Sequence, residues 1–323
     1  KLQGNESTPK KVTLSEFFKG FTDHEEKRPI TEPRKIKESS PFSNIKTFSP
    51  SMYNTFLNSL PFKECTHPNG LLNLTSYLPN HFNPPDLGPI VFIETGRNFN
   101  DSRGTIQLKL DVSDSLYIMT HSYKSGHELP NIKCAVLWHI FGYQDTNKIR
   151  CYLKNWNEKR KKKLRINYSD YIHDQSIYLT NEMLMELKEQ QGVVAYQIYQ
   201  NVGDCIFIPA GCAYQVLNLS NCIQVSTGYI SPERTYQCTQ LASEFRKLPK
   251  KHYQNNDLAQ VQNHILFSNS QCISILENND NKLLDFIESP QKPKKSRIIR
   301  QTTPEYDINR YSFRKRTKLD KYL

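Results

Sequence analysis

Lys109 and Asp111 place an ammonium and a carboxylate two residues apart in the run 105–112. The run alternates between two sets, which are Ile106, Leu108, Leu110 and Val112 on one side and Thr105, Gln107, Lys109 and Asp111 on the other. This period of two predicts a β-strand, in which residues i and i+2 point the same way. The two charged groups should therefore lie side by side. A lone carboxylate can bind a metal ion, but a neighbouring ammonium favours an ion pair instead.

The elements that would position these groups are best defined at residues 203–216, which read GDCIFIPAGCAYQV. Residues 205–208 alternate as a half-buried strand does, and 214–219 follow as a second strand. Pro209-Ala210-Gly211 predicts a tight corner between them, because Pro fixes φ and Gly permits a positive φ. A strand, a tight corner and a strand is how a double-stranded β-helix, the jelly-roll or cupin barrel, forms the back of its pocket.

Together with 108–114 (LKLDVSD), 138–141 (WHIF) and 172–175 (IHDQ), this stretch resembles the catalytic domain of the JmjC histone lysine demethylases of the histone H3 lysine-9 type. The resemblance runs from about residue 41 to 248. Further landmarks in the same order are 72–74, 85–89, 145–146, 203–204, 207–211 and 231–233. It implies a mainly β fold with helical additions: a JmjC double-stranded β-helix flanked by N- and C-terminal helices. Active members of that family use Fe(II) and 2-oxoglutarate.

The resemblance also implies where a metal would bind. The family holds Fe(II) with a His-x-Asp pair on one strand and a second His on a distant strand. Lys109 and Tyr214 stand at the two His positions here, and only Asp111 matches. An ammonium (unperturbed pKa about 10.4) and a phenol (about 10) must lose their protons before they bind a metal. We expect neither Fe(II) nor 2-oxoglutarate to bind, Asp111 to be a vestigial ligand, and Lys109 to pair with Asp111 in place of the metal.

Three histidines could supply other ligands. His139 lies in the WHIF motif that active members also have beside their own ligands, so we expect it in the core. His121 and His127 flank a predicted loop, which favours solvent exposure. A rearranged site of Asp111 with His121 stays open as an alternative.

The co-substrate side and the nearby carboxylates have their own alternatives. Gln224 stands where typical family members have Lys, and the sequence alone does not decide whether this position touches 2-oxoglutarate. Asp111 and Asp114 could be plain strand-end or turn carboxylates. We interpret 203–204 and 209–211 as turns that maintain the fold.

The chain divides into three predicted parts: residues 1–40, an N-terminal helix (12–21) and charged linker; 41–288, the JmjC barrel with C-terminal helices; and 289–323, a basic tail with little fixed structure. Predicted strands are 90–94, 105–112, 116–122, 135–141, 193–200, 205–208, 214–219 and 223–228. Predicted helices are 51–60, 145–157, 181–189, 235–245 and 256–277. Because the chain begins with Lys1, we expect it to be the C-terminal part of a longer protein.

The charge and the cysteine content limit the cellular compartments and the binding partners that fit this chain. The formal net charge is +11, and residues 289–323 hold eleven Lys and Arg against three Asp and Glu, so the tail carries +8 of it. Its basic clusters 292–297 and 314–318 suit nuclear import or contact with nucleic-acid phosphates, although a solvated tail is an equal interpretation. The basic run 159–165 predicts a solvated loop, and no apolar run is long enough to span a membrane. The eight cysteines show no C-x-x-C pair, which favours reduced thiols in the cytosol or nucleus.

Three functions are compatible with these observations. The first is a chromatin-associated transcription regulator in the nucleus, a pseudo-demethylase that contacts histone tails or chromatin proteins. The second is an active or residually active Fe(II)/2-oxoglutarate dioxygenase that demethylates a histone lysine through a relocated ligand set. The third is a nuclear protein that binds nucleic acid through residues 289–323.

Overall fold

The computed structural model describes residues 49–83, 85, 87–97, 102–123, 135–160, 166–252 and 260–277. By its contacts the chain divides into Lys1–Ser274, which contains all the strands described below, and Ile275–Leu323. The predicted helix 12–21, the linker before residue 41, His127 and the basic tail all lie outside the described residues. The three-part division therefore stays a prediction.

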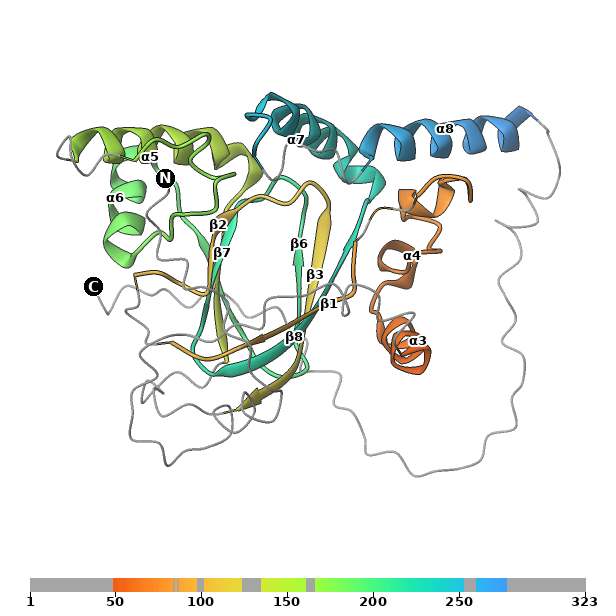
Figure 1. Ribbon diagram of the computed structural model, residues 1–323, viewed down its shortest axis with the longest axis horizontal. Coiled ribbons are helices and arrows are strands. Elements are labelled where there is room, and N and C mark those ends of the chain that lie inside the picture. Colours follow the sequence, from red (N-terminus) through yellow and green to blue (C-terminus); the bar gives the residue numbers. More distant parts are fainter. Residues whose placement is uncertain are drawn as a thin grey trace. The chain divides into compact units, whose positions relative to one another are not determined.

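Two four-stranded antiparallel sheets form the centre of the described part (Figure 1). The first sheet has the order β1-β8-β3-β6 and the second β2-β7-β4-β5. Their bounds are β1 Ile90–Glu94, β2 Ile106–Lys109, β3 Asp114–Tyr123, β4 Val136–Ile140, β5 Tyr196–Gln200, β6 Cys205–Ile208, β7 Tyr214–Asn218 and β8 Asn221–Tyr229. Strands distant in sequence are neighbours in both sheets, as a jelly roll requires. The predicted mainly β, double-stranded β-helix fold is confirmed.

Aromatic side chains fill the space between the two sheets. Tyr117 of the first sheet packs edge-on against Trp138 of the second, with ring centroids 4.9 Å apart. Trp138 also packs on Tyr214, whose side chain is fully buried. These residues belong to one buried cluster with Val136, Ile140 and Val216. Because side chains alternate along a strand, the residues between them point to the outer faces, where the helices pack.

Helices cover both outer faces. The α-helices are α3 Pro50–Ser59, α4 Lys63–Thr66, α5 Thr146–Lys159, α6 Asn181–Gln191, α7 Thr235–Lys247 and α8 Val261–Glu277, and the 3-10 helices are η1 Leu74–Tyr77, η2 Tyr143–Asp145 and η4 Pro232–Arg234. The α3 side chains Phe56 and Leu57 pack on Leu116 of the first sheet. On the other side, α5 and α6 pack against the β2 segment. None of the helices in the described ranges is long and apolar enough to cross a membrane.

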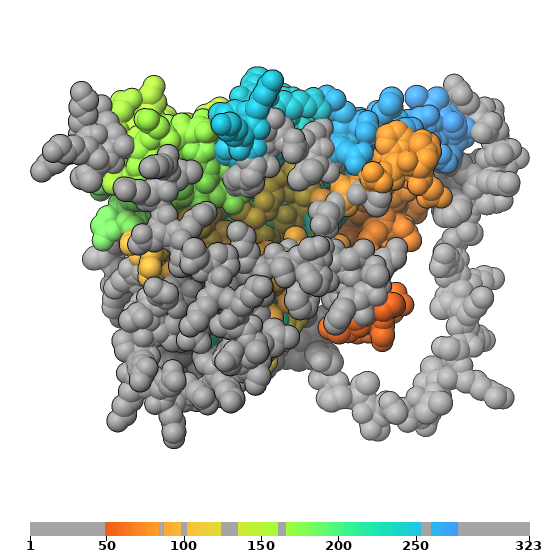
Figure 2. All heavy atoms as spheres, viewed as in Figure 1, coloured from red at the N-terminus to blue at the C-terminus, as the bar shows by residue number. Residues whose placement is uncertain are grey.

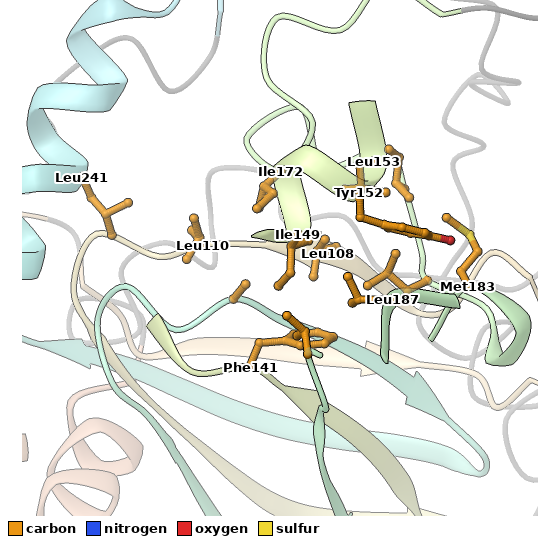
Figure 3. Packing of buried hydrophobic residues seen from close by; sticks show 14 residues of the cluster. Leu108, Leu110, Phe141, Ile149, Tyr152, Leu153, Ile172, Met183, Leu187 and Leu241 are labelled. Carbon is orange, nitrogen blue, oxygen red and sulfur yellow. The ribbon is translucent and has the colours of Figure 1, made fainter. Parts of the chain in front are cut away.

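The β2 segment departs from its predicted alternation. β2 ends at Lys109, and its register against β7 shifts between Ile106 and Lys109. Ile106 packs on the cluster between the sheets, whereas Leu108 and Leu110 join the cluster beneath α5. Figure 3 shows Leu108 and Leu110 close to Ile149 of α5. The prediction that Ile106 and Leu108 share a face was wrong, because the register irregularity lets neighbouring odd and even positions change sides.

Other boundaries follow from local chemistry. Helix α6 begins where the Thr180 hydroxyl accepts a hydrogen bond from the Met183 amide, and it ends at Gly192 with φ 66°. The strand predicted over 193–200 begins only at Tyr196. Residues 256–259, predicted as the start of the last helix, lie outside the described ranges. The cysteines of the described residues carry no disulfide.

Candidate functional site

The structure brings the three predicted site residues together. Lys109 and Tyr214 are register partners across β2 and β7. The Lys109 Nζ lies 3.1 Å from Asp111 Oδ1, so the predicted ion pair is confirmed. The Tyr214 hydroxyl donates to the other carboxylate oxygen, Asp111 Oδ2, at 2.5 Å. Lys109 Nζ also lies 5.0 Å from the centre of the Tyr214 ring, within cation–π distance.

Two further residues complete this cluster from β3. The Tyr117 hydroxyl lies 2.7 Å from that of Tyr214. A phenol has one proton, and Tyr214 gives its own to Asp111, so Tyr117 is the donor in this pair. Lys109 in turn hydrogen-bonds to Tyr117, which closes a ring of hydrogen bonds between the two sheets. Ser115 Oγ donates to Asp111 Oδ2 at 3.3 Å. We call Lys109, Asp111, Ser115, Tyr117 and Tyr214 the Asp111 cluster.

Protonation follows from these contacts. Burial alone would lower the pKa of Lys109, but Asp111 and the Tyr117 hydroxyl outweigh burial and raise that pKa above its usual value. Burial, and then the charge of Asp111, raise the pKa of Tyr214 well above its usual 10.0. Burial likewise raises the pKa of Tyr117. At neutral pH the cluster therefore holds one ammonium and two neutral phenols.

A cavity of about 250 Å³ opens beside the cluster. Lys109, Asp111 and Tyr117 line it, together with the rings of Phe92 and Phe245. The Asp111 side chain is 24% exposed and that of Lys109 16%, so the ion pair is reached from this cavity. The opposite charges cancel within the wall, which leaves a pocket with no net charge.

Gln224 takes part in a separate network deeper between the sheets. Its amide nitrogen donates to Gln200 Oε1 at 2.9 Å, and the Trp138 indole donates to the same oxygen at 2.8 Å. The Gln200 amide nitrogen donates in turn to the backbone carbonyls of Tyr117 and Asp204. Gln224 is buried and does not line the cavity. Its polar group is satisfied by protein neighbours.

The histidines do not join the Asp111 cluster. His139 is buried between Gln197 and Gln215, its register partners on β5 and β7, and burial lowers its pKa to about 4. It alternates with Trp138 and Ile140 and so points away from Tyr214, which confirms it as a core residue. His121 is exposed, as predicted, although it lies within β3. It follows Ser115 by six residues, which places it roughly 20 Å along the strand at about 3.3 Å per residue.

Asp114 has the structural role that the sequence left open. Its side chain is buried, with Oδ1 accepting from the Ala210 amide at 2.8 Å and Oδ2 from the Ser231 amide at 2.9 Å. The carboxylate thus fixes the tight corner after β6 to the turn after β8. The positive φ of Gly211, 84°, confirms the predicted corner.

The IHDQ motif forms a second charged group, which the sequence did not reveal. Arg150 of α5 binds Asp170 at 3.0 Å and Glu244 of α7 at 2.7 Å, and the buried His173 lies 3.0 Å from the same Glu244 oxygen. Burial would raise the pKa of Glu244, but His173 and Arg150 together lower it to about 2. His252 binds Asp174 at 3.2 Å. These contacts hold α5, the 170–174 segment and α7 together.

The donor set at the Asp111 cluster does not fit Fe(II). Non-haem iron of the oxygenases takes two imidazoles and a carboxylate, whereas Asp111 is here surrounded by an ammonium and hydroxyl groups. Among the residues that the structure describes, no group of three or more His, Cys, Asp or Glu could hold a metal ion. Sequence reasoning missed Ser115 and Tyr117. The sequence did contain a signal for them, because Ser115 and Tyr117 are two residues apart on the strand that follows Asp111 and so point the same way.

Comparisons with known proteins agree with this fold. Residues 116–229 match the family described as JmjC domain, hydroxylase. Lysine-specific demethylase 3A of Gallus gallus is 34% identical over 84% of this chain and 23% of its own length. Lysine-specific demethylase 3 of Drosophila melanogaster is 31% identical over 81% of this chain and 34% of its own length.

Lysine-specific demethylase JMJ29 of Arabidopsis thaliana is 31% identical over 76% of the chain. The chain spans about a quarter to a third of the length of these relatives, 23% of the Gallus protein and 34% of the Drosophila and Arabidopsis proteins. With its two-sheet barrel and its matched residues, the chain carries a JmjC domain and is homologous to the lysine-specific demethylase 3 proteins.

Proposed function

We propose that the chain is a chromatin-associated regulator whose JmjC barrel, of the histone H3 lysine-9 demethylase type, no longer turns over Fe(II) and 2-oxoglutarate. The observation that carries this proposal is the Asp111 cluster. Lys109 Nζ binds one oxygen of the Asp111 carboxylate, and the Tyr214 hydroxyl donates to the other. The carboxylate that would bind a metal is therefore already bound by protein donors.

Electrostatics support the same conclusion. Lys109 keeps its proton because its pKa is raised, and a cation beside Asp111 repels a divalent cation. Tyr214 would need to become a phenolate, which its raised pKa opposes at neutral pH. Any metal would thus have to displace an ammonium and deprotonate a buried phenol together. Asp111 is then a vestigial ligand.

The barrel itself is intact around this cluster. Asp114 still joins its two turns, and the ring of hydrogen bonds through Tyr117 links the two sheets where a metal would otherwise bind ligands. A barrel stabilised in this way can serve as an interaction module. From the homology to lysine-specific demethylases, we propose nuclear localisation and histone tails or chromatin proteins as partners. A DNA contact through residues 289–323 stays a prediction.

An active dioxygenase is the alternative. It requires a relocated ligand set, for which the sequence offered Asp111 with His121. The roughly 20 Å of strand between Ser115, which binds Asp111, and the exposed His121 argues against a shared metal ion. Ligands of a transition metal such as zinc lie within about 2 to 2.3 Å of the metal.

Anaerobic Fe(II) titration, with and without 2-oxoglutarate, tests the proposal. We expect the natural chain to bind no stoichiometric Fe(II) and the Lys109→His/Tyr214→His variant to bind one equivalent. Lys148→His/Tyr196→His, which makes the same exchanges at exposed positions, is the matched control and should bind none. One tight equivalent of Fe(II) in the natural chain would refute the proposal and point to other ligands.

A further inference from the structure

The carboxylates of the charged group around Glu244 are paired within the fold. Asp170 and Glu244 are bound by Arg150, and Asp174 is bound by His252. These acidic groups are therefore already occupied by contacts within the fold. Apart from Arg150, the lysines and arginines of α5 and α7 are exposed.

Two sets of exposed cations follow this charged group in the sequence. On α5, Lys154 follows Arg150 by four residues and so lies on the same side of the helix, and Lys159 ends the helix. At the end of α7, Arg246 and Lys247 follow Glu244, and Lys250 and Lys251 come next. We call these six residues the α5–α7 basic face.

The Arg150–Glu244 ion pair, at 2.7 Å, links α5 to α7. Figure 1 shows α5 and α7 along the upper edge, and Figure 2 shows their atoms at the surface there. Between residues 245 and 252 the sequence has no Asp or Glu, and Glu158 is the one acidic residue exposed on α5. Arg160, just after α5, lies over the Trp156 ring at 4.8 Å.

From this geometry we infer that the α5–α7 basic face binds the phosphate backbone of a duplex nucleic acid. Phosphate binding depends on clustered cations and needs no apolar centre. Specific protein partners usually bury aromatic or apolar residues at the middle of an interface. Apart from Cys151, the exposed positions of α5 in its helical bounds are Asn, Lys and Glu, and those after Glu244 are Arg, Lys and Pro. A nucleic acid therefore fits this face better than an acidic protein does.

The face lies next to the cavity at the Asp111 cluster. Phe245 follows Glu244 in α7, lines the cavity and packs edge-on against His173 with ring centroids 4.8 Å apart. A nucleic acid held on the face would thus lie beside the pocket. This inference does not depend on the barrel being inactive, because none of the six cations belongs to the Asp111 cluster.

Fluorescence anisotropy with the full chain and a short DNA duplex tests the inference across a series of salt concentrations. The test variants are Lys247→Gln/Lys251→Gln and Lys154→Gln/Lys159→Gln. Lys63→Gln/Lys188→Gln, which removes two exposed lysines elsewhere, is the matched control. We expect each test pair to weaken binding about tenfold and to lower the salt slope by about two, since each phosphate contact contributes about 0.9. The control should match the natural chain, because its lysines are outside the face.

A parallel arm with an RNA duplex separates the two kinds of nucleic acid, and an arm with polyglutamate tests an acidic polypeptide. Test variants that bind both duplexes like the control would overturn the inference, since residues 289–323 would then supply the affinity. Polyglutamate that binds as tightly as the duplex, with the same loss in the test variants, would assign the face to an acidic protein instead. Unchanged thermal unfolding of all variants shows that the substitutions act on binding.

Discussion

Asp111 and Asp114 are three residues apart, yet their carboxylates have different neighbours. Asp114 is buried and binds two backbone amides, Ala210 and Ser231. Asp111 is 24% exposed to a cavity and binds the side chains of Lys109, Tyr214 and Ser115. Asp114 thus binds the backbone of the barrel, whereas Asp111 binds only side chains, which substitutions can replace.

This difference explains how a barrel can keep its fold while its site changes. Backbone donors are present whatever the side chains are, so the role of Asp114 is the same in any barrel with these two turns. The neighbours of Asp111 are all side chains, so their chemistry can change from metal ligands to an ammonium and a phenol. Stability should therefore depend strongly on Asp114 and by smaller steps on the Asp111 cluster.

The largest effect should come from Asp114→Ala. This change removes two hydrogen bonds to a charged group and leaves two buried amides without acceptors, at about 1.5 to 3 kcal/mol each. We expect the free energy of unfolding, measured by urea denaturation, to fall by about 3 kcal/mol or more. Asp111→Ala should cost less, because two of its partners, Lys109 and Ser115, line the cavity and can reach water there. An equal loss at both positions would contradict the comparison.

Lys109→Met should have the next largest effect. It leaves the partly buried Asp111 carboxylate with hydroxyl donors only, which we expect to lower the free energy of unfolding by about 2 kcal/mol. Lys148→Met is the matched control, because Lys148 pairs with Asp145 at the same 3.1 Å but is 51% exposed. Exposed pairs contribute at most about 1 kcal/mol. Equal losses in the two variants would show that the cluster is no more than a surface ion pair.

How far the sequence predicted these roles also differs between the two carboxylates. The period of two placed Lys109 and Asp111 together, and the Pro-Ala-Gly corner predicted the turn that Asp114 holds. The partners of Asp114 could not be predicted, because they are the backbone amides of Ala210 and Ser231. Almost every residue type has a backbone amide, so the sequence does not show which amides bind the carboxylate. The shift that separates Ile106 from Leu108 was also hidden, since a register irregularity depends on the neighbouring strand. Tyr117 was missed because its contact crosses between sheets.

The free energy of unfolding should depend on pH at alkaline pH because of two groups that bind Asp111. The pKa values of Lys109 and Tyr214 are raised in the folded chain. Above about pH 10 the unfolded chain loses these protons first, so the free energy of unfolding falls as pH rises, by up to about 1.4 kcal/mol per pH unit for each group. Tyr214→Phe should make this decline shallower and cost about 1 kcal/mol at neutral pH.

Tyr196→Phe is the control for that measurement, since Tyr196 is 64% exposed. Urea denaturation between pH 8 and 11 gives the slopes directly, and the control should follow the natural chain. A Tyr214→Phe variant with the same alkaline slope as the natural chain would mean that Tyr214 does not keep its proton through the cluster.

The smallest effect should come from Ser115→Ala, which tests how much of the Asp111 cluster depends on each hydroxyl. Ser115 Oγ lies 3.3 Å from Asp111 Oδ2, longer than the 2.5 Å from the Tyr214 hydroxyl to the same oxygen. That oxygen keeps its shorter bond in the variant, so we expect a loss of about 0.5 kcal/mol in the free energy of unfolding. Ser113→Ala, on the same segment and also lining the cavity, should show what removing a hydroxyl costs without a bond to Asp111. If Ser115→Ala cost as much as Lys109→Met, the carboxylate would depend on the full set of its donors, and Asp111 would be as tightly fixed as Asp114.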